Sequence, residues 1–204
     1  GMVTTNDRLL WLKMWEYKDH GKSFDAVYNQ DHPEGFKWLH ESFGTNWRMT
    51  EMQGAIGRIQ LKHMKEWTDI RNRNSSILTK AFSEFVGEDR LLRIPQLKCD
   101  DGSVHGYYKY YVFVQENGIN NRWDRDQIIA EINSKGVPCI HGSCSEIYLE
   151  KAFDKTKFRP KNRLPNAKEL GETSMVFLVH PTLSEDEMHQ ISEIAISIFD
   201  QAAK

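Results

Sequence analysis

The feature that most constrains the fold is one long amphipathic stretch that begins at Thr50. Gln53 follows three residues later, which is the spacing of a capping box, in which each side chain bonds a free backbone N–H at a helix start. Apolar residues then recur every three or four positions, and this predicts one long helix with its apolar face directed inward against a larger fold. That face comprises Met52, Ala55, Ile56, Ile59, Met64, Trp67, Ile70, Ile77, Leu78, Phe82 and Phe85.

Two polar side chains, Asn46 and Arg48, stand in the turn directly before this helix. An amide and a guanidinium beside a helix N-terminus, where backbone N–H groups are unpaired, suit the oxygens of a phosphate or a carboxylate. The sequence therefore indicates an anion site. The open alternative is that both side chains only cap and brace the helix.

The chain before the long helix is predicted to hold one short helix and an aromatic loop. Asn6 or Asp7 can cap a helix that runs to about Asp19. Residues 22–43 are rich in aromatic side chains but show no period. We expect them to form a loop that covers another part of the molecule, because that much aromatic area is rarely left in water.

After the long helix, strand and helix patterns alternate, which predicts an α/β fold of α+β-like type: a small sheet with helices packed on one face. Gly87 and the turn-forming run at 98–106 mark the preceding boundary. The predicted elements are strands at 107–115, 137–141 and 175–179, helices at 124–136 and 145–153, and a last helix capped by Ser184 and Glu187.

Charge and composition exclude several classes of protein. The formal net charge of −2 gives no electrostatic footprint for nucleic acid. No apolar run approaches the roughly eighteen residues of a membrane helix, and the start carries no secretory signal pattern. The three cysteines cannot all pair with one another. We therefore expect a cytoplasmic protein with no nucleic-acid or membrane partner.

The turn and the helix start together resemble the DegT/DnrJ/StrS family of pyridoxal-phosphate-dependent sugar aminotransferases, which have the fold type I, aspartate aminotransferase-like architecture. The shared residues are Gly44, Asn46, Arg48, Met49, Gln53, Ala55, Gln60 and Leu61. Later stretches that keep the family's order are 107–114, 136–141, 165–167 and 178–183. The resemblance covers nearly the whole chain, but only the C-terminal half of such an enzyme.

The resemblance implies three domains. Residues 1–49 would be a remnant of the large cofactor domain, 50–86 a long bridging helix, and 87–204 the small C-terminal α/β domain. It also implies that the lysine that holds the cofactor lies upstream of residue 1. We therefore expect no catalytic residue in this chain and no covalently bound cofactor.

The resemblance also implies the cofactor, pyridoxal 5′-phosphate, and three site residues. Asn46 is expected to reach the cofactor phosphate of the neighbouring subunit, with Arg48 at the mouth of the same site on the substrate side, so that both roles need a homodimer. His141 is expected to face the sugar-nucleotide substrate. The family usually shows His-Tyr-Pro there, whereas Gly142 and Ser143 follow here, which changes the expected shape of that substrate wall.

The activity implied for the parent enzyme is transfer of an amino group from an amino acid, glutamate, to a keto-sugar attached to a nucleotide. The alternative is a catalytically inactive, truncated domain that folds and dimerises. Such a domain would perform no chemistry.

A zinc site is a further alternative. Cys139 and His141 alternate onto one face of a strand, and a turn could return Cys144 toward them. A tetrahedral site needs a fourth ligand, and neither His105 nor Cys99 has a supporting spacing. We expect no metal site.

An RNA-binding sheet is the remaining alternative, because exposed aromatic side chains on a strand can stack bases. The glycines and basic residues of that strand motif are missing. A core strand is therefore the expected role of Tyr107, Tyr108, Tyr110, Tyr111 and Phe113.

Overall fold

The computed structural model describes residues 2–35, 37–95 and 102–204. The chain divides into two units, an N-terminal unit of residues 1–62 and a C-terminal unit of residues 63–204. The boundary between the units falls within the longest helix, α3 (Glu51–Ala81).

The N-terminal unit contains the predicted first helix, α1 (Arg8–Lys18). Its N-cap is Asp7, whose carboxylate accepts hydrogen bonds from the backbone N–H groups of Leu9 and Leu10 at 2.8 and 3.1 Å. The prediction of an entirely irregular aromatic loop is wrong, because α2 (Phe24–Tyr28) lies inside it. A helix of five residues is too short to show a period in the sequence.

The capping box of α3 is confirmed. The backbone N–H of Gln53 donates to Thr50 Oγ1 at 3.3 Å, and the backbone N–H of Thr50 donates to Gln53 Oε1 at 2.9 Å. The apolar face of the first half of the helix is exposed in this chain, so its burial against a larger fold stays a prediction. The only buried residues of α3 are Asn74, Ser75 and Leu78, whereas Met52, Ile56, Ile59 and Met64 are exposed.

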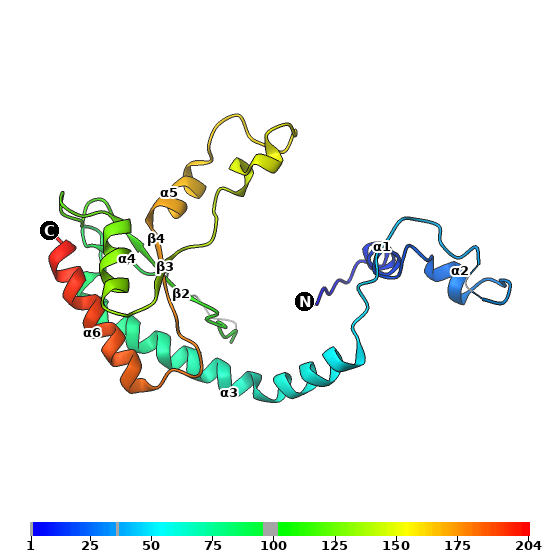
Figure 1. The fold of residues 1–204 in the computed structure, drawn as a ribbon, viewed down its shortest axis with the longest axis horizontal. Helices are drawn as coiled ribbons and strands as arrows, with labels where there is room; N and C mark the ends of the chain where they lie inside the picture. The colour runs from blue at the N-terminus through cyan, green and yellow to red at the C-terminus, as the bar shows by residue number, and fades with distance from the viewer. Residues whose placement is uncertain (1, 36, 96–101) are drawn as a thin grey trace. The chain divides into compact units, whose positions relative to one another are not determined.

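The C-terminal unit contains a four-stranded sheet of β1 (Leu92–Arg93), β2 (Tyr110–Val114), β3 (Cys139–His141) and β4 (Ser174–Phe177). The strand order is β1-β2-β4-β3, and every neighbouring pair is antiparallel. Figure 1 shows β4 beside β3 and β2. The three predicted strands are confirmed. β1 was not predicted, because a strand of two residues is too short to show an alternation of apolar and polar side chains.

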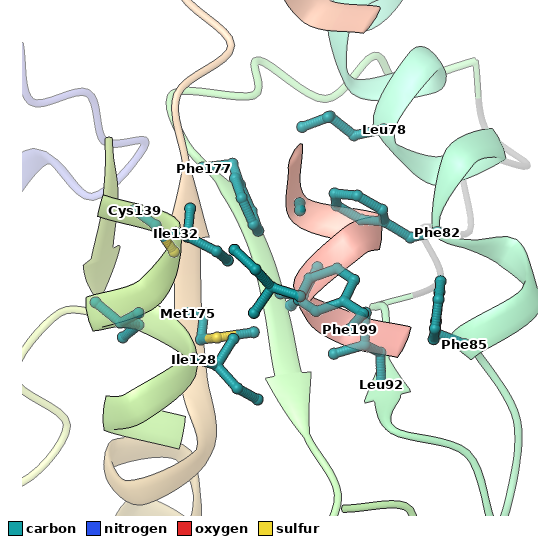
Figure 2. Close-up of a cluster of buried hydrophobic side chains, with 14 of the residues drawn as sticks. Leu78, Phe82, Phe85, Leu92, Ile128, Ile132, Cys139, Met175, Phe177 and Phe199 are labelled. Atoms are coloured by element: carbon teal, nitrogen blue, oxygen red, sulfur yellow. The ribbon is translucent and has the colours of Figure 1, made fainter. Parts of the chain in front are cut away.

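One face of the sheet forms the core together with α4 (Arg125–Ser134), α6 (Glu185–Ala202) and the end of α3. Figure 2 shows Phe82, Phe177 and Phe199 gathered there. The ring centroid of Phe82 lies 5.4 Å from that of Phe177 and 5.1 Å from that of Phe199. The predicted architecture, a long helix and a small sheet with helices on one face, is confirmed.

The prediction of a helix at 145–153 is wrong. Two 3₁₀ turns, Ile147–Leu149 and Lys151–Phe153, occupy that stretch, because Glu150 between them has an extended backbone with ψ of 144°. A further helix, α5 (Pro165–Thr173), was not predicted and has no side-chain cap. Within the described ranges, no helix has both the length and the apolar character that crossing a membrane requires.

Candidate functional site

Backbone hydrogen bonds hold the segment that carries Asn46 against the end of α1. Residues 45–47 pair antiparallel with residues 17–20, and Asn46 lies opposite Asp19. The N–H···O=C bonds measure 2.7–3.0 Å and run from Thr45 to Tyr17, from His20 to Thr45 and from Trp47 to Lys18. This backbone pairing makes neighbours of Asp19 and Asn46, which are far apart in the sequence.

Gly44 permits this close approach. A Cβ at this position would lie 2.4 Å from the backbone nitrogen of Gly21 and 2.7 Å from the carbonyl oxygen of Tyr17. Both atoms are backbone and cannot turn aside as a side chain does. Any side chain at this position would therefore push the Asn46 segment away from α1.

Asn46 and Arg48, the two residues predicted for an anion site, are in direct contact. Arg48 Nε donates to Asn46 Oδ1 at 3.2 Å, and the backbone N–H of Arg48 approaches the same oxygen at 3.4 Å. The Asn46 residue is exposed, and the Arg48 side chain is 49% exposed. The structure thus brings both residues together at an accessible surface of the N-terminal unit.

A buried carboxylate, Asp19, lies behind this pair and was missed in the sequence. Arg48 Nη1 is 3.4 Å and Lys22 Nζ 3.7 Å from Asp19 Oδ1, while Lys18 Nζ is 4.0 Å from Asp19 Oδ2. Three basic side chains therefore surround one carboxylate. No local pattern could have indicated this, because the contact depends on pairing two distant segments.

His141 belongs to the C-terminal unit and is the last residue of β3. Its Nε2 lies 3.1 Å from Asp126 Oδ1, and Arg125 Nε donates to the same carboxylate. Partial burial of Asp126 opposes its charged form, but the hydrogen bonds from Arg125 and His141 outweigh this and lower the pKa of Asp126. An ionised carboxylate can only accept hydrogen bonds, so the nitrogen of His141 that faces Asp126, Nε2, carries a proton. The other ring nitrogen, Nδ1, does not take part in this contact.

The loop after His141 is held by Tyr111. The hydroxyl groups of Tyr111 and Ser143 are 2.8 Å apart, and the backbone N–H of Ser143 donates to the Tyr111 oxygen at 3.2 Å. The hydrogen bond with Ser143 lowers the pKa of Tyr111. A Cβ at Gly142 would lie 2.2 Å from Ser174 Oγ. The tyrosine that the family usually has at this position would therefore require Ser174 to move.

The cysteines do not support the zinc interpretation. Cys139 lies in the core (Figure 2), and burial raises the pKa of its thiol to about 12. Cys144 is exposed. The described ranges contain no group of three or more His, Cys, Asp or Glu residues placed to hold a metal ion. Cys99 lies outside the described residues.

The aromatic strand has the burial of a core strand, since four of the five residues of β2 are buried. The Tyr110 hydroxyl lies 2.8 Å from Thr79 Oγ1. Burial raises the pKa of Tyr110 to about 12, although the hydrogen bond with Thr79 opposes the shift. Tyr107, Tyr110, Tyr111 and Phe113 pack within the C-terminal unit rather than forming an open platform for bases. The core role expected of Tyr108 is wrong, because this residue precedes β2 and is 85% exposed.

The sequence pattern of the DegT/DnrJ/EryC1/StrS aminotransferase family matches residues 1–195. The chain is 54% identical in sequence to an aminotransferase of Psychrobacter cryohalolentis whose X-ray structure is known. The match covers 98% of this chain and 51% of that one, with a TM-score of 0.85.

Two curated relatives are more distant. A pleiotropic regulatory protein of Geobacillus stearothermophilus is 25% identical over 193 residues, which is 95% of this chain and 45% of the relative. A dTDP-3-amino-3,4,6-trideoxy-alpha-D-glucose transaminase of Streptomyces venezuelae is 23% identical over 151 residues, or 74% of this chain and 36% of the relative. The chain spans about half the length, or less, of the proteins it matches.

Proposed function

The chain belongs to the DegT/DnrJ/EryC1/StrS aminotransferase family. We propose that it is the C-terminal half of an enzyme that transfers an amino group from glutamate to a nucleotide-linked keto-sugar. The observation that carries the proposal is 54% identity to the Psychrobacter aminotransferase across 98% of the chain. The name of the Streptomyces venezuelae relative, a transaminase of a dTDP-linked sugar, supports the substrate class.

Enzymes of this family use pyridoxal phosphate, and the Asn46 segment fits its phosphate group. The amide NH₂ of Asn46 is a donor on an exposed residue, next to the guanidinium of Arg48. In the proposed enzyme Asn46 donates to the cofactor phosphate in the neighbouring subunit, and Arg48 lies on the substrate side. When bound, the cofactor supplies the electron sink for amino transfer, while residues of this chain bind and orient.

His141 is the proposed substrate contact in the C-terminal unit. Asp126 holds the Nε2 side of the ring, so Nδ1 is the atom that would meet a polar group of the sugar nucleotide. Ser143, held by Tyr111, contributes a small hydroxyl where the family pattern has bulkier residues. The division into residues 1–49, 50–86 and 87–204, and a cytoplasmic location, are part of the same proposal.

The proposed enzyme is a homodimer. None of the residues of α1 is buried, and large apolar side chains on this helix and on the first half of α3 are exposed. Large apolar side chains left exposed in such numbers usually mark an interaction site. The remainder of the large domain and a second subunit are the proposed cover for Leu9, Leu10, Trp11, Trp47, Met52, Ile56 and Ile59.

The test is a hybrid enzyme, in which the half of the Psychrobacter protein that this chain does not match is joined to this chain. We expect glutamate-dependent amino transfer to at least one keto-sugar in a panel of dTDP- and UDP-linked compounds, measured by mass spectrometry of the product. The intact Psychrobacter enzyme is the control. A hybrid that folds and binds pyridoxal phosphate but aminates none of them would favour the inactive dimerising domain.

A further inference from the structure

We propose that Arg48 acts on the cofactor phosphate through Asn46: its guanidinium fixes which end of the Asn46 amide faces the phosphate, and Asp19 holds that guanidinium in place. This inference rests on the proposed function, because it concerns the same Asn46. It assigns Arg48 and Asp19 as positioning residues, in addition to the substrate-side role proposed for Arg48.

The side-chain amide of an asparagine has two chemically different ends, an NH₂ donor and a carbonyl oxygen acceptor. A rotation of the amide by half a turn exchanges the NH₂ donor for the carbonyl oxygen. Only the donor end stabilises a phosphate, since the oxygen would face phosphate oxygens of like polarity. An exposed amide with no fixed partner would divide its time between both orientations.

Arg48 removes this ambiguity. A guanidinium has only donors, so the atom of Asn46 that faces Arg48 Nε at 3.2 Å must be the amide oxygen. The backbone N–H of Arg48 approaches the same oxygen at 3.4 Å. With its oxygen held by Arg48, the amide turns its NH₂ group away from Arg48 and keeps it free to donate.

Asp19 fixes Arg48 in turn. The residue is 8% exposed, and within the described part of the chain its Oδ1 makes no hydrogen bond. A buried carboxylate oxygen without a hydrogen bond depends on nearby positive charge. Arg48 Nη1 supplies such charge at 3.4 Å, and Asp19 and Asn46 lie opposite each other in the backbone pairing. The guanidinium therefore links two residues whose positions the backbone has already set.

The arrangement requires an arginine rather than any cation. Nε reaches the amide and Nη1 reaches the carboxylate from one rigid plane. A lysine ammonium carries the same charge but offers a single point, which cannot occupy both positions. If Arg48 orients the Asn46 amide, Arg48→Lys should weaken binding of the cofactor phosphate. If Arg48 contributes only its charge, Arg48→Lys should leave that binding intact.

The test is a double-mutant cycle in the hybrid enzyme, read as the equilibrium dissociation constant for pyridoxal phosphate and, separately, for pyridoxal, which lacks the phosphate. We expect Asn46→Ala to weaken binding of pyridoxal phosphate on the order of tenfold or more. When Asn46 is present, affinity for pyridoxal phosphate should fall in each of three variants, Arg48→Gln, Arg48→Lys and Asp19→Asn. In the Asn46→Ala background, each of these substitutions should change that affinity by less than about twofold. Binding of pyridoxal should stay unchanged, and Lys18→Gln is the matched control for loss of one nearby charge.

The outcomes separate the two proposals. If Asn46→Ala binds pyridoxal phosphate normally, Asn46 is no phosphate ligand, and both its proposed role and this inference fail. If Arg48→Gln costs the same affinity with and without Asn46, or if Arg48→Lys retains full affinity, the inference alone fails. A second readout uses the 204-residue chain itself, where NMR relaxation should show the Asn46 side-chain amide ordered and Arg48→Gln should make it mobile. Equal mobility in both proteins would overturn the inference.

Discussion

Glu146 shows how one ion pair can organise a long irregular segment. The guanidinium of Arg163 bonds both carboxylate oxygens of Glu146, and the Tyr148 hydroxyl donates to Glu146 Oε1 at 2.7 Å. The Tyr148 oxygen also accepts from the backbone N–H of Leu164 at 2.9 Å. The hydrogen bonds from Arg163 and then Tyr148 lower the pKa of Glu146 to about 2. Two stretches of the segment between β3 and α5 are therefore tied together through one carboxylate.

The first prediction concerns the titration of Glu146. Since its pKa falls on folding from 4.5 to about 2, its stabilising contribution is fully present above pH 4.5 and is lost as the pH falls toward 2. A carboxyl-carbon NMR titration should give a midpoint near 2, and Arg163→Gln should move it back toward 4.5. Arg159→Gln, which removes the partner of Asp154, is the control. Equal midpoints in both variants would contradict the assignment.

The second prediction concerns cysteine reactivity. Cys139 is 1% exposed and burial raises the pKa of its thiol to about 12, whereas Cys144 is exposed. The thiolate is the reactive form, so at pH 8 iodoacetamide should modify Cys144 quickly and Cys139 only after unfolding. Mass spectrometry of peptides at timed intervals measures both, with Cys144→Ser as control. Alkylation of Cys139 at the rate of Cys144 would show that the core is open.

At the scale of elements, capping signals in the sequence were reliable, whereas the pattern read as a helix at 145–153 was not. The predicted capping boxes at Thr50 and Ser184 both form, since each needs only residues three apart. The elements missed were short, as with α2 and β1, or lacked a side-chain cap, as with α5. Periodicity showed which side chains of α3 share a face but not what covers them.

The candidate site follows the same rule. Asn46 and Arg48 were found because they are two residues apart and stand before a helix. Asp19 was not found, because its place beside Asn46 depends on backbone pairing between distant segments. Asp126 was likewise missed as the partner of His141. The sequence and its family resemblance indicated Asn46, Arg48 and His141, and in each unit the structure added the carboxylate beside them.

The third prediction concerns the cap of α6. The backbone N–H of Glu187 donates to Ser184 Oγ at 3.2 Å. Ser184→Ala leaves that helix start uncapped and should lower the free energy of unfolding by about 1 kcal/mol. Ser197→Ala, at an exposed position within the same helix, should leave it unchanged or slightly higher. Urea denaturation measures both, and equal losses would show that the cap contributes nothing.

At the scale of the whole molecule, the two units differ in what they bury. The C-terminal unit has a continuous apolar core of strands and helices. Among the described residues of the N-terminal unit, the buried apolar side chains are Ala26 and Leu39, while most of the large apolar side chains are exposed. The chain spans about half the length of its relatives. Exposed apolar surface on the N-terminal unit is expected if the other half of the proposed enzyme packs there.

The fourth prediction is self-association through residues 1–85. Exposed apolar surface on α1 and α3 should drive dimer or higher assembly, because leaving it in water is unfavourable. Light scattering over a wide concentration range should give a mass above that of one chain. Replacing Ile56 and Ile59 by glutamine should restore the monomer, with the same change at the exposed Leu170 of α5 as control. A single monomer mass throughout would contradict the prediction.

In the proposed enzyme, this chain completes an aminotransferase site whose cofactor-binding lysine lies in another segment. The most direct measurement is to incubate the 204-residue chain and the hybrid enzyme with pyridoxal phosphate, reduce with borohydride, and map the modified lysine by mass spectrometry. We predict only scattered, substoichiometric labelling of the chain alone, and one stoichiometric site in the hybrid, within the Psychrobacter half. One stoichiometric site on a single lysine of this chain, together with glutamate-dependent amino transfer, would contradict the proposed division of the site.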